Sequence, residues 1–275
     1  MTTMAVSKTR AAQLLGISRS SLYYRSKQFI KDWQLKIRME EALRHFPSYG
    51  HKRLGPYLKI GKNRARRVMK KFGLKPYRRR GRKFKKRKDN GQVYPNLLMA
   101  VIPNGPQQVW VSDFTHLVYG KTILYLATVM DIWTREVVGF SLSTSHSVWL
   151  IIEAFLSALN FRGPPEMIHS DQGSEYKSRV YTGLVEEVGV KISMSHKASP
   201  WENGYQESFY SQFKVDLGDP NRFEEMGKLV AEIYHTIYSY NNTRIHTALK
   251  MSPKEYAILK TLTLNHGYPS SEKVS

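Results

Sequence analysis

The hydrophobic pattern of the chain changes at residue 109 from helical spacing to strand-like runs. Three apolar runs follow one another at residues 109–119, 122–132 and 135–144, with two-residue turns between them. Turns this short join antiparallel neighbours, so the runs predict a β-meander. The elements expected next are a helix at 147–160, a strand at 165–170, a helix at about 175–188, a strand at 190–194, a polar loop at 195–203 and two or three further helices. This order predicts an α/β fold.

The first 75 residues instead have the spacing of short helices. Residues 8–25 predict a helix-turn-helix, with Gly16 at the turn and Ser18 as the cap of its second helix. The apolar side chains expected inside this unit are Ala11, Leu14, Leu15 and Leu22. The side chains expected on the outer face of its second helix are Arg19, Ser20, Tyr23 and Tyr24. An outer face of this kind can contact duplex DNA.

A second helical unit is expected at residues 35–46, 49–58 and 63–74. Gly55-Pro56 should bend or end its middle helix, and Gly73 should cap its last helix. The last helix is expected to bury Ala65, Val68, Met69 and Phe72 and to expose Arg64, Arg67, Lys70 and Lys71. A plain bundle with a charged solvent face explains any one such helix equally well. Two basic units in tandem favour DNA binding.

Charge is distributed unevenly along the 275 residues. Residues 1–90 contain 28 Lys and Arg against 4 Asp and Glu, whereas residues 91–275 contain 15 against 18. A basic region joined to a nearly neutral one indicates polyanion binding, although a solubilising surface, a ribosomal protein or a membrane-surface protein would also be basic. The positive charges of residues 77–90 repel one another, so this segment predicts an extended arm. Such an arm binds DNA phosphates without recognising the base sequence. The contacts expected from this arm are Arg78, Arg79, Arg80, Lys85 and Lys86.

Composition also excludes several classes of site and of location. The chain has no cysteine, which excludes disulfides and cysteine zinc sites, and its nine His residues form no zinc-finger pattern. The N-terminus lacks the apolar stretch of a signal peptide, and the most apolar segment, 148–161, is too short to span a bilayer and contains Glu153. We therefore expect a cytoplasmic protein with no membrane partner.

Three acidic residues on separate elements are candidate metal ligands. Asp113 lies within the first strand among apolar neighbours, where a carboxylate is costly unless it reaches the sheet rim or binds a cation. Asp171 follows the strand at 165–170, at the end where open α/β sheets bind ligands. Glu207 lies on a helix expected at 203–217, and Lys214 shares its face two turns later. The apolar stripe expected on the other side of that helix is Tyr205, Phe209, Phe213 and Leu217.

Carboxylates from separate elements suit Mg²⁺ or Mn²⁺, and two such ions can activate a nucleophile and stabilise a leaving oxygen in phosphodiester chemistry. No Ser/His/Asp triad or Gly-rich phosphate loop competes with this interpretation. Each acid taken singly is more often an ordinary rim carboxylate. Asp131 also ends an apolar strand, so the residues alone do not separate it from Asp113.

Sequence motifs around the acids resemble those of a known family. Asp171 and Glu207 have 35 residues between them, the interval of the DDE transposases and retroviral integrases. The segments QVWVSDFTHL (108–117), HSDQGSEY (169–176), SHKASPWENGYQESFYSQFK (195–214), YSYNNTRIHTALKMSPKEYA (238–257), YGHKRL (49–54), RRVMKKFGLKP (66–76) and YPNLL (94–98) resemble OrfB-type transposases of the insertion sequence 3 family. The resemblance covers about residues 10–257.

This resemblance implies an RNase H-like integrase core, with a mixed five-stranded sheet flanked by helices, preceded by an all-α tandem helix-turn-helix region. It implies cleavage and joining of DNA strands with Mg²⁺ or Mn²⁺, two ions per site. The acid triad falls on Asp113, Asp171 and Glu207, and the family's lysine falls on Lys214. The expected organisation is a DNA-binding region at 1–75, a basic linker at 76–105, a catalytic core at 106–265 and a tail at 266–275. The DNA contacts expected from the helical units are Arg19, Tyr23, Arg64, Arg67 and Lys70.

The chain departs from the family pattern at Gln206, at Trp201-Glu202 and at Glu136. The upstream coiled coil of the family's fusion products is also missing. The expected partners are transposon-end and target duplex DNA at the bacterial nucleoid, further copies of the chain, and an upstream OrfA-type protein. Two alternatives are an inactive DNA-binding regulator with a transposase skeleton, and an RNase H-like nuclease acting on RNA–DNA hybrids or DNA junctions. The complete triad disfavours the first, and the tandem helical units disfavour the second.

Overall fold

The computed structural model describes residues 7–23, 28–77, 94–196 and 200–265. Its centre is a five-stranded sheet in the order β3-β2-β1-β4-β5. The strands are β1 (Val109–Tyr119), β2 (Thr122–Asp131), β3 (Val137–Ser143), β4 (Met167–Ser170) and β5 (Lys191–Met194). β1, β2 and β3 are antiparallel neighbours, while β4 runs parallel to both β1 and β5. The predicted meander and mixed sheet are therefore confirmed.

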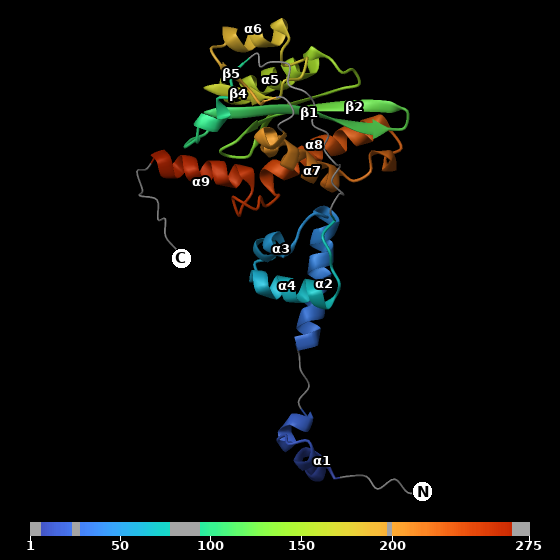
Figure 1. Cartoon of the computed structure of the whole chain (residues 1–275). Coiled ribbons are helices and arrows are strands. Elements are labelled where there is room, and N and C mark those ends of the chain that lie inside the picture. The colour runs from blue at the N-terminus through green and yellow to red at the C-terminus, as the bar shows by residue number, and fades with distance from the viewer. Residues whose placement is uncertain (1–6, 24–27, 78–93, 197–199, 266–275) are drawn as a thin grey trace.

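Helices cover both faces of the sheet (Figure 1). On one face, α5 (Val148–Arg162) and α6 (Arg179–Glu187) enclose an apolar cluster around Trp110 and Phe155. On the other face, α7 (Gly204–Leu217) and α8 (Met226–Asn242) enclose a cluster around Val111 and Phe213. Successive side chains of β1 enter opposite clusters because side chains alternate along a strand. The helix α9 (Pro253–Asn265) packs on α8.

Close packing of α5 on the sheet depends on Gly139 of β3. A Cβ atom there would lie 2.5 Å from backbone atoms of α5, closer than the 3.0 Å at which real Cβ atoms stop. The short 3-10 helices that complete the described chain are η1 (Arg19–Tyr23), η2 (Leu98–Ala100), η3 (Pro200–Asn203) and η4 (Pro220–Arg222). Within the described residues, no helix is long and apolar enough to cross a membrane.

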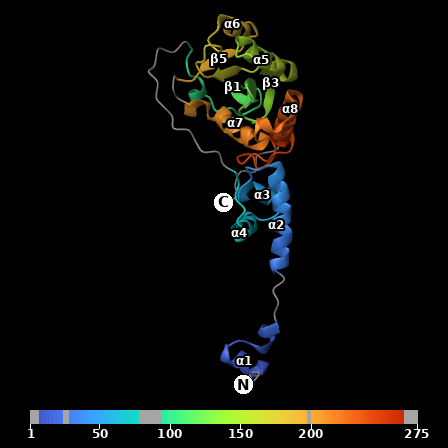
Figure 2. The same ribbon diagram turned by 90° about the vertical axis from the view of Figure 1, so that its right-hand side faces the viewer.

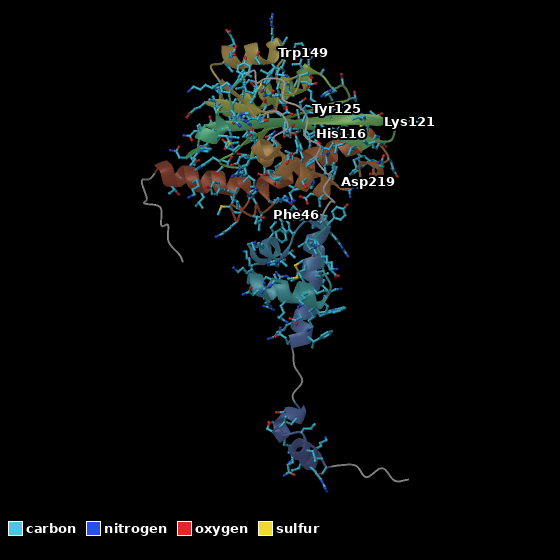
Figure 3. The ribbon with its side chains drawn as sticks, in the orientation of Figure 1. Phe46, His116, Lys121, Tyr125, Trp149 and Asp219 are labelled. Atoms are coloured by element: carbon cyan, nitrogen blue, oxygen red, sulfur yellow. The ribbon has the colours of Figure 1, made fainter. Side chains whose placement is uncertain are left out.

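The second helical unit is a small bundle of α2 (Gln28–His45), α3 (His51–Tyr57) and α4 (Lys62–Lys71). It begins earlier than the predicted residue 35. Ala65, Val68 and Met69 are buried as expected, and Gly73 adopts φ +67° after α4. Phe46 lies at the end of the bundle nearest the core (Figure 3).

The first helical unit differs from its prediction. The helix α1 (Lys8–Leu14) ends before Gly16, whose φ of +62° makes the turn, and the Oγ of Ser18 accepts a hydrogen bond from the Ser21 backbone. The second element, however, is only the 3-10 turn η1. Leu14 and Leu15 are 75% and 65% exposed, so these two residues are not buried as predicted, while the side chains of Ala11 and Leu22 lie outside the described residues.

The bundle is joined to the core through Arg244, which follows α8. Its Nε pairs with Asp216 at 2.5 Å, and its Nη2 donates to Ser48 and Gln212, both at 2.8 Å. The backbone N–H of Ile245 donates to the Tyr49 hydroxyl at 2.7 Å. Arg244 is only 2% exposed, so this polar junction is buried. Figure 2 shows the bundle of α2, α3 and α4 adjoining the core on the side of α7 and α8.

The end of the predicted linker lies on the core. The Met194 backbone N–H donates to Pro95, and the Leu97 N–H donates to Ser193, so residues 94–98 run beside β5. Tyr94, Leu97 and Leu98 pack against the two apolar clusters of the core.

Candidate active site

The first site residue, Asp113, lies half-buried on β1, on the face of the sheet that α7 covers. Its Oδ1 accepts the Phe114 N–H at 2.8 Å, and its backbone oxygen accepts the Tyr210 hydroxyl at 2.6 Å. Burial, followed by the negative charge of Asp171, raises the pKa of Asp113 to about 8. A carboxyl group held near other carboxylates resists ionisation until a cation arrives.

Strand pairing explains why Asp171 is near. Val111 of β1 is paired with His169 of β4, and Asp113 and Asp171 each lie two residues further along these parallel neighbours. Asp171 Oδ1 accepts the Gly173 N–H at 2.9 Å, and the residue is exposed to solvent. Removal of water from the carboxyl group by the surrounding protein raises the pKa of Asp171, and the negative charge of Glu175 adds to the rise. The Gly173 hydrogen bond and the positive charge of Lys177 oppose it.

Glu207 is presented by α7, with its side chain exposed and its pKa raised by partial burial. Its negative charge contributes to the raised pKa of Asp113, whereas the half-buried Lys214 lowers that pKa. Both α7 residues therefore act electrostatically on the β1 carboxylate.

The helix α7 is fixed to the sheet by Gln206. Its Nε2 donates to the backbone oxygens of Val111 and Thr128, at 2.7 and 3.2 Å, and its Oε1 accepts the Thr128 hydroxyl at 3.0 Å. Gln206 is completely buried. Gln206 departs from the family pattern, and its polar side chain is explained by the two strand carbonyl groups to which it donates hydrogen bonds. The prediction that Tyr205 belongs to the core stripe is wrong, because Tyr205 is 37% exposed and Gln206 and Tyr210 face the sheet instead.

The carboxyl groups are not assembled at coordination distance. In the part of the chain that the structure describes, no group of three His, Asp or Glu side chains is close enough to hold a metal ion. The donor set itself suits a hard divalent cation, because it consists of carboxylate oxygens. Repulsion between the acids, which helps to raise the pKa of Asp113, is the electrostatic condition that such a cation would relieve.

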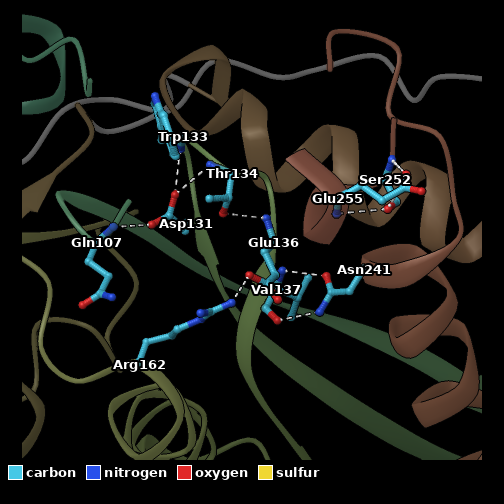
Figure 4. A network of polar contacts seen from close by, with 10 residues as sticks. All are labelled: Gln107, Asp131, Trp133, Thr134, Glu136, Val137, Arg162, Asn241, Ser252 and Glu255. Atoms are coloured by element: carbon cyan, nitrogen blue, oxygen red, sulfur yellow. Dashed lines mark hydrogen bonds and ion pairs between the residues drawn. The ribbon is translucent and has the colours of Figure 1, made fainter. Parts of the chain in front are cut away.

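Asp131, which the residue pattern without the family resemblance did not separate from Asp113, has a structural role. Its Oδ1 accepts the backbone N–H groups of Trp133 and Thr134, both at 2.9 Å, and its Oδ2 accepts that of Gln107 at 2.6 Å (Figure 4). It is 2% exposed. Three backbone donors occupy its oxygens, so this carboxylate holds the β2–β3 turn.

The two other departures from the family pattern are also structural. Glu136 forms an ion pair with Arg162 of α5 (Figure 4). Glu202 accepts hydrogen bonds from Asn96 and from the His196 backbone, both at 2.7 Å, and so ties the segment before the core to the loop after β5.

A pair beside the site was missed by the sequence reasoning. Glu175 Oε1 lies 3.2 Å from His146 Nε2, and the His146 ring stacks on Tyr125 with 5.1 Å between ring centroids. Glu175 also raises the pKa of Asp171. The motif at 169–176 contains Glu175, but no local pattern marks His146.

The predicted DNA contacts fall into three groups. Arg19, Arg64 and Lys70 are exposed. Arg67 instead donates two hydrogen bonds, at 2.6 and 2.7 Å, to the buried Asp32, which also pairs with Lys71. The side chain of Tyr23 and residues Arg78, Arg79, Arg80, Lys85 and Lys86 lie outside the described residues.

Comparisons with known proteins identify the family. Integrase core domain models match residues 103–200 and 188–253, and the Fis family model of bacterial regulatory proteins matches residues 4–29. The transposase of insertion sequence element IS904 from Lactococcus lactis is 34% identical over 68% of this chain and 72% of its own length. The chain belongs to the insertion sequence 3 family of DDE transposases.

Other known proteins are also similar to this chain. The 31 kDa protein of insertion element IS600 from Shigella sonnei is 32% identical to this chain, over 89% of this chain and 96% of its own length. Transposase InsF of IS3A from Escherichia coli is 32% identical over 56% and 54% of the two chains. The solved structure of the HTLV-2 integrase catalytic core domain in complex with magnesium matches with a TM-score of 0.44 and 21% identity, over 56% of this chain and 98% of that one.

The chain is therefore a DDE transposase, a polynucleotidyl transferase that mediates transposition of an insertion sequence. Its integrase core carries the mixed sheet described above, and its N-terminal part is the helical region.

Proposed function

We propose that Asp113, Asp171 and Glu207 form the catalytic acid set of the transposase. The observation that supports this proposal is the pairing of Val111 on β1 with His169 on β4, because Asp113 and Asp171 each follow these two partners by two residues. The face of α7 that bears Glu207 and Lys214 acts electrostatically on the same carboxyl group.

The three carboxylates of Asp113, Asp171 and Glu207 would hold Mg²⁺ or Mn²⁺, two ions in all. When bound, these ions make a water or a hydroxyl more acidic and stabilise a leaving oxygen. Lys214 is placed to contact a DNA phosphate beside the acids. The reaction is a pair of in-line displacements at phosphorus: water releases a 3′ hydroxyl, and that hydroxyl then attacks a second phosphodiester, whose own 3′ oxygen leaves.

The helical region would hold the transposon end. Arg19, Arg64 and Lys70 are exposed on it, and the block at 77–90 supplies further positive charge. We propose the organisation 1–75 for DNA binding, 76–105 for the basic linker, 106–265 for catalysis and 266–275 for the tail. Two transposon ends require at least two copies of the chain on chromosomal DNA of the nucleoid, and an OrfA-type protein is a further proposed partner.

The test is strand cleavage by the Asp113→Asn variant. The full chain is incubated with Mg²⁺ and a labelled duplex that carries the end of the element, and cleavage and binding are measured on the same samples. We expect cleavage to fall by at least about a thousandfold while end binding changes less than about threefold, because the carboxylate acts on the reacting groups. Glu187→Gln, which removes an exposed acid of α6, is the control and should cleave like the wild type. Cleavage by Asp113→Asn at the wild-type rate would refute the assignment.

A further inference from the structure

A cavity of about 400 Å³ lies at the junction of the bundle and the core, beside α7. Three arginines from three separate elements line it: Arg53 of α3, Arg135 of the β2–β3 turn and Arg244 after α8. The other lining residues are Met130, Gly204, Tyr205, Ser208, Phe209, Gln212, Tyr240 and His246. None of these described lining residues is acidic. The residue Glu207 is not among them, so the cavity is separate from the acid set.

Several buried donors in this cavity have no partner. Arg135 Nε and Nη1, Arg53 Nε and His246 Nδ1 are buried and make no hydrogen bond within the described part of the chain. An unpaired buried donor costs about 1–3 kcal/mol, and more when it is charged. Convergent unpaired donors therefore indicate that an acceptor binds here.

The conformation of Arg135 is fixed and strained. Its backbone φ is +63°, a value in the left-handed region that residues other than glycine seldom adopt. Its guanidinium lies 4.1 Å from the centre of the Tyr205 ring. Strained residues persist where the surrounding structure holds them for function.

The charges in the cavity favour an anion. Arg244 is neutralised by Asp216, whereas Arg53 and Arg135 have no acidic partner among the described ion pairs. Burial, together with the charge of Arg244, lowers the pKa of Arg53 to about 10. His246 is neutral near pH 7 because burial and the three arginines lower its pKa to about 4. Arg53 Nη1 donates a hydrogen bond to the neutral Gln212 Oε1 at 2.9 Å, so a bound anion would supply the negative charge that both guanidinium groups lack.

We propose that this cavity binds a backbone phosphate of DNA, with Arg135 and Arg53 as its donors. The planar donor fork of arginine matches a phosphate, and the cavity has room for the attached sugar. One lining residue, Ser208, is exposed, so the cavity reaches the solvent there. The cavity borders α7, the helix whose other face carries Glu207 and Lys214, so one helix would contact the DNA strand at two places. This inference rests on the proposed binding of DNA by the chain.

The test combines a protein variant with removal of single phosphates. Arg135→Asn removes the guanidinium, and asparagine tolerates positive φ, so this variant should fold. Binding of the full chain to a series of end duplexes, each with one methylphosphonate, is measured at several salt concentrations. We expect one position at which the neutral linkage weakens wild-type binding about tenfold but leaves Arg135→Asn binding unchanged. The salt dependence of Arg135→Asn should also be smaller by about one phosphate contact.

The control is Lys121→Gln, which removes one positive charge from the exposed tip of the β1–β2 hairpin (Figure 3). Arg53→Gln is the second variant and should lose sensitivity to the same phosphate. Equal sensitivity of the wild type and Arg135→Asn at every position would overturn the inference. The inference would also be overturned if Arg135→Asn bound DNA like the wild type but no longer self-associated, because the cavity would then hold a carboxylate of a second copy. Failure of the wild type to bind the duplex at all would instead contradict the proposed function.

Discussion

The Gln206 side chain donates a hydrogen bond to the backbone oxygen of Val111, two residues before Asp113 on β1. Glu207 is the next residue on α7, so one buried amide fixes the register between the strand that carries Asp113 and the helix that carries Glu207, two of the proposed catalytic acids. The distance between two acids that are far apart in sequence thus depends on a side chain that takes no part in the chemistry.

Replacing Gln206 should therefore weaken both the fold and the site. In Gln206→Leu, the Val111 and Thr128 oxygens lose their buried donor, and the free energy of unfolding should fall by about 1–3 kcal/mol. Urea unfolding measures this loss. Glu207→Gln, at the adjacent exposed position, should unfold like the wild type; an equal loss in both variants would contradict the anchoring role.

Asp131→Ala should destabilise the transposase, because Asp131 has a structural role in the β2–β3 turn. Three backbone N–H groups lose their acceptor, so the free energy of unfolding should fall by more than about 2 kcal/mol. Urea unfolding of this variant should contrast with that of Asp113→Asn, because the Asp113 carboxylate accepts one backbone hydrogen bond, from Phe114, whereas Asp131 accepts three. Wild-type stability of Asp131→Ala would show that the turn does not need this carboxylate.

Asp113 should make the metal-free protein less stable as pH rises. Its pKa is about 8 in the folded chain and 3.8 in an unfolded one, so the stability that the neutral carboxyl group contributes is present below pH 4 and is lost as pH rises through 8. Relative to Asp113→Asn, wild-type stability should decline between pH 4 and 8 by at most about 1.4 kcal/mol per pH unit. Urea unfolding in the presence of a chelator measures this difference. Parallel curves for the two proteins would show that the pKa of Asp113 is not raised.

The buried pair of Arg244 and Asp216 should join the bundle to the core. Arg244→Met leaves the Asp216 carboxylate unpaired, and the free energy of unfolding should fall by about 3 kcal/mol or more. A second change, Asp216→Leu, should restore part of this loss because it removes the unpaired charge. Calorimetry on the single and double variants tests this; additive losses would contradict the pairing.

Sequence patterning predicted the sheet well, because alternation and short turns mark antiparallel strands such as β1 and β2 directly. Spacing on α7 correctly separated Glu207 from Phe209 and Phe213. It misplaced Tyr205, because the core side of α7 accepts the polar Gln206 wherever strand carbonyls need a donor.

The roles of charged residues were less predictable. Asp113 and Asp131 both lie on apolar strands, so their surroundings in the sequence did not reveal that Asp131 accepts hydrogen bonds from the Gln107, Trp133 and Thr134 backbones. The ion pair of Arg67 with the buried Asp32 was not predicted, because the two residues lie 35 positions apart. Contacts across such separations leave no local pattern.

The absence of cysteine from the chain allows a direct test of metal ligation by Glu207. In Glu207→Cys the new thiol is the sole one, and sulfur binds Mg²⁺ poorly but softer ions such as Mn²⁺ better. The measurement is the rate of strand cleavage of an end duplex by this variant in Mg²⁺ and in Mn²⁺, with the wild type alongside. We expect Glu207→Cys to be inactive in Mg²⁺ and to regain cleavage in Mn²⁺, whereas equal loss in both metals, or full activity in Mg²⁺, would contradict a metal site built from Asp113, Asp171 and Glu207.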